Sequence, residues 1–130
     1  MGLMGPRNAQ VALLASATKT ATNATAKLRN RHVRGVLLLL NVSAASGTGG
    51  LTVRIRAYET ISGNTINLLA DTAAITATGT YGFLLHPNAG AAADGIRVSR
   101  AFLLSQDWDV QISHGDASNY TYSLSAELLP

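Results

Sequence analysis

Three histidines are the side chains in this sequence best suited to metal binding or general-base catalysis. His32, His86 and His114 lie far apart along the chain, and none has a second ligand at a spacing typical of metal sites. The chain contains no cysteine, which removes thiolate chemistry and cysteine-based zinc sites. The sequence therefore predicts no metal site and no cofactor.

A pair of carboxylates is the next candidate for chemistry. Asp107 and Asp109 point to the same side of a predicted strand, a spacing compatible with paired carboxylates or with calcium. Calcium needs six or more oxygen ligands, and no aspartate-rich loop supplies them. Two acids that flank an inward-facing Trp108 explain the pattern equally well, so we expect both carboxylates on an exposed face.

Motifs for nucleophilic catalysis and phosphate binding are also missing. The Gly-x-Ser-x-Gly pattern of serine hydrolases does not occur. The glycine-rich segment at residues 47–50 has no lysine and no following helix, both of which a phosphate-binding loop needs. We therefore expect a protein that is not an enzyme.

Charge is distributed unevenly along the chain. Eight of the ten Lys and Arg side chains lie in residues 1–58, which contain no acid, whereas all seven acids lie in residues 59–130. If the fold keeps these halves on different surfaces, the basic side can contact an acidic partner or a neighbouring copy. The basic stretch 27–34 has no aromatic residue for base stacking, which argues against nucleic acid. The candidate partner-binding side chains are Lys27, Arg29, Arg31, Arg34, Arg97 and Arg100.

The element that must organise the fold is an apolar run at residues 36–42. A buried helix is the competing interpretation, but the run follows Gly35, ends in a Gly/Ser-rich stretch and is too short for a typical helix. As a strand it has two apolar faces, which predicts a central strand buried on both sides. One face carries Val36, Leu38, Leu40 and Val42, and the other carries Leu37 and Leu39.

Alternation of apolar and polar residues predicts the other strands. Residues 51–59 alternate strictly, and the turn at 62–64 should return the chain as a hairpin through 65–70. Further strands are expected at 11–18, 73–78, 81–85, 108–114 and 120–126, with the last two paired as a hairpin. Residues 87–95 break the pattern, residues 96–104 have no clean period, and a loop this long favours an interaction surface. Additional core residues are expected at Val53, Ile55, Trp108, Val110, Ile112, Tyr122 and Leu124.

Seven or eight strands without a convincing helix predict an all-β protein. We expect a single-domain antiparallel β-sandwich of the jelly-roll type over residues 11–130, preceded by an N-terminal arm at residues 1–10; a small barrel is the alternative. No apolar run approaches the length needed to cross a bilayer, so we expect no membrane partner.

Several short motifs, read together and in order, resemble a family of small proteins from tailed bacteriophages. One segment departs from that family: Tyr58-Glu-Thr-Ile61 stands where its members have an acidic residue followed by proline before the Ser-Gly turn. The matching motifs are Leu13-Leu-Ala-Ser-Ala-Thr18, Arg34-Gly-Val36, Asn41-Val-Ser-Ala-Ala-Ser-Gly-Thr48, Leu51-Thr-Val-Arg-Ile55, Ser62-Gly63, Ile75-Thr-Ala-Thr-Gly79, His114-Gly-Asp-Ala-Ser118 and Tyr120-Thr-Tyr-Ser123.

The resemblance implies a small β-sandwich component of the virion. It suggests a decoration (cement) protein that is made in the host cytoplasm, binds the outside of the capsid and stabilises the shell. Its expected partners are the major capsid protein and further copies of itself, with a trimer favoured. A minor head-tail or tail protein is an alternative, and a carbohydrate-binding β-sandwich module is an alternative from another class.

Overall fold

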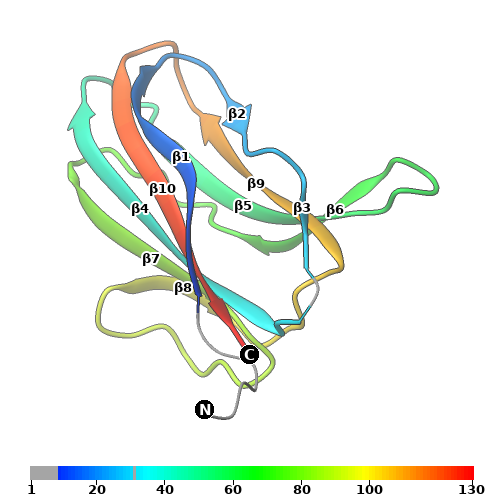
Figure 1. Cartoon of the computed structure of the whole chain (residues 1–130). Helices are drawn as coiled ribbons and strands as arrows, with labels where there is room; N and C mark the ends of the chain where they lie inside the picture. The colour runs from blue at the N-terminus through cyan, green and yellow to red at the C-terminus, as the bar shows by residue number, and fades with distance from the viewer. Residues whose placement is uncertain (1–8, 31) are drawn as a thin grey trace.

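The computed structural model describes residues 9–30 and 32–130, which form two packed β-sheets (Figure 1). The fold is an all-β sandwich, as the sequence predicted, and the described residues form ten strands instead of seven or eight. The first sheet contains, in spatial order, β1 (Ala9–Lys19), β10 (Tyr120–Leu129), β4 (Gly35–Ala45), β7 (Gly79–Leu85) and β8 (Ile96–Arg100). The second contains β2 (Asn23–Ala24), β9 (Asp107–His114), β5 (Leu51–Tyr58) and β6 (Thr65–Ala70), with β3 (Leu28–Arg29) also paired to β9.

Strand β4 occupies the middle of the first sheet, between β10 and β7. Its inward face is completely buried, but its outward face is not: Leu37 is half-buried and Leu39 is 39% exposed. The prediction that β4 is buried on both faces is therefore wrong for the outer face. The reason is that, among the described residues, only the second sheet covers the first sheet, and it packs against the inner face of β4 and not the outer face.

The core lies between the inner faces of the two sheets. Strand β5 alternates as its sequence predicts, with Val53 and Ile55 fully buried and Arg54 and Arg56 on the outer face. The hairpin to β6 forms as expected, and the Glu59 carboxylate accepts hydrogen bonds from the backbone N–H and the hydroxyl of Ser62 in its turn. All the core residues named from the sequence are buried: Val36, Leu38, Leu40, Val42, Val53, Ile55, Trp108, Val110, Ile112, Tyr122 and Leu124.

The expected hairpin between the last two strands does not form. Strand β9 pairs with β5 in one sheet, whereas β10 pairs with β1 and β4 in the other, so residues 115–119 cross between the sheets. Both strands carry their large apolar side chains on one face, and these faces meet across the core instead of lying side by side. Asp116 caps the crossing, accepting hydrogen bonds from the N–H groups of Gly49 (2.7 Å) and Ser118 (3.2 Å).

This crossing touches the earlier crossing from β4 to β5. The N–H of Gly115 donates to the carbonyl of Gly50 at 2.9 Å. A Cβ atom on Gly115 would lie 2.4 Å from the carbonyl oxygen of Gly49, so the two backbones approach as closely as only glycine permits. The two crossings therefore close one end of the sandwich together.

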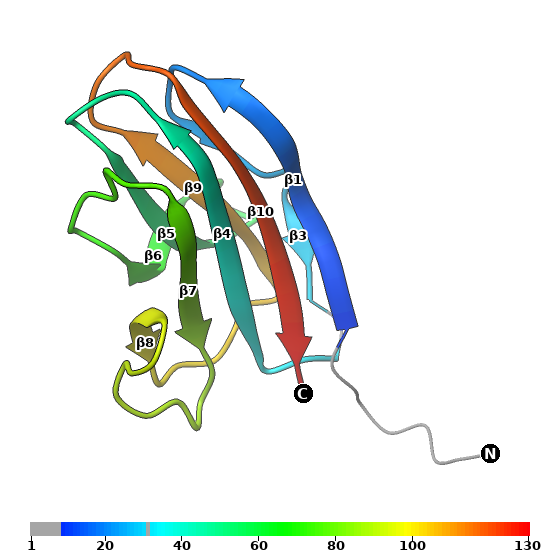
Figure 2. The same ribbon diagram turned by 90° about the vertical axis from the view of Figure 1, so that its left-hand side faces the viewer.

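The first and last described strands are neighbours in the first sheet, because β1 pairs with β10 (Figure 2). The strand expected at residues 11–18 runs from Ala9 to Lys19. Ala9 and Gln10 therefore belong to the sheet and not to the predicted arm, whose residues 1–8 lie outside the described part of the chain.

The segment between β6 and β8 differs from its prediction in two ways. Residues 73–78 form no strand, and only Ile75 bridges to Leu51. Strand β8, which the sequence did not indicate, pairs parallel with β7, whereas the other described strand pairs are antiparallel. Arg97 joins the two regions, since its guanidinium lies 2.6 Å from the Asp71 carboxylate and donates to the carbonyl of Ala73 at 2.8 Å.

In the described residues no helix is long and apolar enough to cross a membrane.

Candidate partner-binding site

The fold mixes the basic half of the sequence with the acidic half. Strand β5 from the basic half pairs with β9 from the acidic half, and Arg56 donates two hydrogen bonds to Asp109, at 2.8 and 2.7 Å. The Asp109 carboxylate raises the pKa of Arg56 above its usual value, chiefly through these hydrogen bonds. Asp109 is buried, so the expectation that both carboxylates of β9 are exposed is wrong for this one. The two halves consequently do not form two oppositely charged surfaces.

The predicted partner-binding side chains do not form one patch. Lys27 lies over the ring of Tyr58, 3.8 Å from its centre, and Arg97 is occupied by Asp71. Arg29 is exposed and lies 3.8 Å from Asp107. Arg31 lies outside the described residues. The two candidates that remain, Arg34 and Arg100, are both exposed.

Arg34 and Arg100 both lie at the end of the sandwich where β10 finishes. The N–H of Arg34 donates to the carbonyl of Leu129, and its carbonyl accepts from the N–H of Leu104, both at 2.9 Å. The N–H of His86 donates to the carbonyl of Arg100 at 3.2 Å, and its Nε2 lies 2.9 Å from the carbonyl oxygen of Pro130. These bonds hold together four segments that are separate in the sequence, around residues 34, 86, 100–104 and 129–130.

The same end exposes two large apolar side chains. Phe102 is 46% exposed and Leu103 is 53% exposed, and both follow directly after β8. The guanidinium carbon of Arg100 lies 5.4 Å from the centre of the Phe102 ring. Exposed aromatic and aliphatic side chains beside arginine are typical of protein-binding surfaces. We call Arg34, His86, Arg100, Phe102 and Leu103 the basic end.

The sequence indicated the arginines of the basic end but not its apolar residues. Residues 96–104 have no clean period, so Phe102 and Leu103 could not be assigned to a core face or a solvent face. The available signal was indirect, since a long interrupted loop favours an interaction surface. In the structure, the exposed apolar side chains of this region are Phe102 and Leu103, which follow β8.

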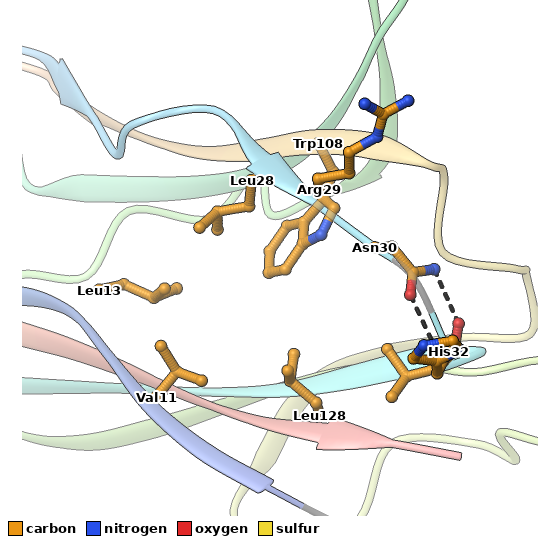
Figure 3. A pocket seen from close by; sticks show the side chains of 9 residues that line it. Val11, Leu13, Leu28, Arg29, Asn30, His32, Trp108 and Leu128 are labelled. Atoms are coloured by element: carbon orange, nitrogen blue, oxygen red, sulfur yellow. Dashed lines mark hydrogen bonds between the residues drawn. The ribbon is translucent and has the colours of Figure 1, made fainter. Parts of the chain in front are cut away.

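An apolar slot of about 240 Å³ lies between the edges of the two sheets (Figure 3). Trp108 and Leu28 face it from the second sheet. Asn30 fixes the loop at its mouth, because its side chain donates to the carbonyl of Val33 at 2.7 Å and accepts from the Val33 N–H at 3.0 Å. The slot can take apolar side chains. The other lining residues are Val11, Leu13, Arg29, His32 and Leu128.

A polar cluster lies at the opposite end of the sandwich, around His114. Its Nε2 lies 2.8 Å from the Tyr122 hydroxyl, which also accepts a hydrogen bond from the side-chain amide of Asn23. Among the described residues, Nδ1 of His114 is buried and has no hydrogen-bond partner. Burial lowers the pKa of His114, Asp116 partly opposes this shift, and Lys19 adds to it.

The lowered pKa of His114 predicts a pH-dependent stability. As the pH falls below the ordinary histidine value of 6.5, the unfolded chain takes up a proton before the folded protein does, so stability decreases. The decrease ends once the folded histidine is protonated as well. We expect the urea midpoint to fall between about pH 7.5 and pH 5.5. The variant H114Q should flatten this dependence, whereas H32Q, at an exposed histidine, is the matched control; an unchanged slope in H114Q would contradict the assignment.

Comparison with known proteins gives no further assignment. No family model, no curated protein and no solved structure matches this chain. Within residues 9–30 and 32–130, no three His, Cys, Asp or Glu side chains come together as a group that could hold a metal ion. The basic end and the apolar slot are therefore the features from which function is inferred.

Proposed function

We propose that this chain is a structural protein of a tailed bacteriophage particle, and that it binds the outside of the capsid as a decoration protein that stabilises the shell. The proposal takes its class from the motifs that resemble small virion proteins. The observation that carries it is the basic end, where Phe102 and Leu103 are exposed beside Arg34 and Arg100. On this proposal the chain acts by binding and not by catalysis.

The chemistry of the basic end suits an acidic protein surface with apolar hollows. Arg34 and Arg100 can form charge-assisted hydrogen bonds with carboxylates, and Phe102 and Leu103 can bury apolar area against the same partner. The major capsid protein is the partner of that kind on this proposal. His86 lies in the same surface, and its contact with Pro130 holds the C-terminal end of the chain against it.

A carbohydrate-binding function is less well supported by the aromatic residues. Sugar sites favour exposed flat rings, but Trp108 is buried in the core. Lys27 covers the ring of Tyr58, and the hydroxyl of Tyr81 is bonded to the carbonyl of Ala77 at 2.7 Å. Tyr58 and Tyr81 therefore make contacts within the protein, and neither offers the open ring face that a sugar would stack on.

The test is re-decoration of purified phage particles that lack this protein. We expect the double variant R34E/R100E to lower occupancy on the particle by about tenfold or more, because it replaces attraction by repulsion at the contact. The charge-matched control is K19E/R54E, whose positions lie outside the basic end. Circular dichroism checks that both variants fold.

Copy number, measured by quantitative mass spectrometry of complete particles, decides between the virion roles. A ratio to the major capsid protein near one, or a fixed large fraction, supports decoration. A few copies per particle would assign the chain to the head-tail junction or the tail. Absence from the particle would overturn the virion function, and equal occupancy of R34E/R100E and its control would remove the basic end from the mechanism.

A further inference from the structure

Strand β1 is an edge strand without the usual protection against further pairing. Among the described strands it pairs with β10 alone. It has eleven residues, and residues 9–18 contain neither a charge nor a proline. Natural edge strands are normally short, charged or interrupted by proline, because their free backbone groups otherwise pair with another chain.

The other sheet edges are better protected. Strands β2 and β3 have two residues each, and β8 carries Arg97 and Arg100. Strand β6 is uncharged, but it has six residues and a register shift against β5. Strand β1 also has register shifts, but they begin after Ala12, so its ladder with β10 is regular over Ala9, Gln10, Val11 and Ala12.

This regular part of β1 has a hollow on each side, apolar on the inner side and mixed on the outer side. On the inner side is the slot formed with Leu28 and Trp108 (Figure 3). On the outer side, a hollow of about 450 Å³ is lined by Ala12, Leu37 and Leu39, together with polar residues. An added strand places alternate side chains on the two faces of a sheet. One extended partner would therefore cover both hollows.

We infer that the partner is a second copy of this chain, whose β1 pairs antiparallel with β1 around a twofold axis at Val11. An antiparallel pair of identical strands is self-complementary, with Val11 opposite Val11 and Gln10 opposite Ala12. Val11 points toward the slot, yet it is 37% exposed. The second Val11 covers this exposed surface. Because residues 9–18 are uncharged, two copies meet there without like-charge repulsion.

Cross-linking tests the twofold axis directly, because the chain has no native cysteine. In V11C the two cysteines face each other across the pair, at a Cα separation of about 4.5–5.5 Å that suits a disulfide. The matched control is I61C, at an almost fully exposed position in the β5–β6 turn. We expect mild oxidation to cross-link V11C at least about tenfold faster than I61C, and equal rates would overturn the inference.

Sedimentation of the unmodified full-length chain gives a second readout that needs no variant to fold. We expect a dimer, or an assembly with an even number of copies, which V11K reduces to half its mass or less. A monomer at about 100 µM, or a trimer in which V11C cross-links no faster than I61C, would overturn the inference. Neither measurement involves the phage particle, so the result is independent of the proposed capsid function.

Discussion

Replacing Leu40 by alanine is expected to lower the free energy of unfolding by about 3 kcal/mol. Leu40 is 0% exposed on the inner face of β4, the central strand of the first sheet. Truncation removes buried apolar surface and leaves a cavity between the sheets. The cavity cannot close, because hydrogen bonds to β10 and β7 hold β4 in place on both sides. Urea denaturation monitored by circular dichroism measures the change, provided that the slope of the transition is unchanged.

The neighbouring residue provides the control. Leu39 lies on the same strand with the same side chain, but it is 39% exposed on the outer face. We expect L39A to cost less than about 1 kcal/mol, because little packed volume is lost. If L39A cost as much as L40A at a concentration where the chain is monomeric, the outer face of β4 would have to be covered within one chain, which contradicts the single inner core described above.

Replacing Asp109 by alanine is expected to cost about 2 kcal/mol. The variant removes both hydrogen bonds from Arg56 and leaves its guanidinium without its carboxylate. Breaking a fully buried pair costs about 3–5 kcal/mol, but the Arg56 side chain is 21% exposed, so water compensates part of the loss. Denaturant unfolding near neutral pH, where the carboxylate is ionised, measures this effect.

Asp107 is the matched control for Asp109. It lies on the same face of β9, but its contact with Arg29 is 3.8 Å long and open to water. Exposed pairs of this kind contribute about 0–1 kcal/mol, so D107A should cost at most a few tenths of a kcal/mol. If D107A and D109A lowered the free energy of unfolding equally, the two hydrogen bonds and the burial of the Arg56–Asp109 pair would not explain its contribution to stability.

Local patterns in the sequence were sufficient for the strands and for much of the core. Strict alternation in residues 51–57 placed Val53 and Ile55 inside, and the apolar run at 36–42 identified the central strand, because both signals depend on the two-residue period of a strand. Pairing partners were not predictable in the same way. A five-residue connection suits a hairpin and a crossing between sheets equally well, and the choice after His114 depends on contacts with β5, β1 and β4.

The candidate site shows the same division between residue type and spatial arrangement. Charge alone identified Arg34 and Arg100 among the candidate partner-binding side chains, yet only the fold places them at one end of the sandwich. The burial of Asp109 was not predictable, because its partner Arg56 comes from a strand 53 residues earlier in the chain. Phe102 and Leu103 had no periodic neighbours that would have assigned them to either face.

The pairing of β1 with β10 also constrains when this protein can fold. Strand β1 is translated before the other described strands, but its only neighbour among them, β10, is made more than one hundred residues later. The first sheet therefore cannot close during synthesis, and an incomplete chain leaves one edge of β4 and the whole of β1 unpaired. Contacts so distant in sequence also make folding slow. A nascent copy thus presents β1 to other chains before its own partner strand exists, and the first sheet is completed only after β10 has been translated.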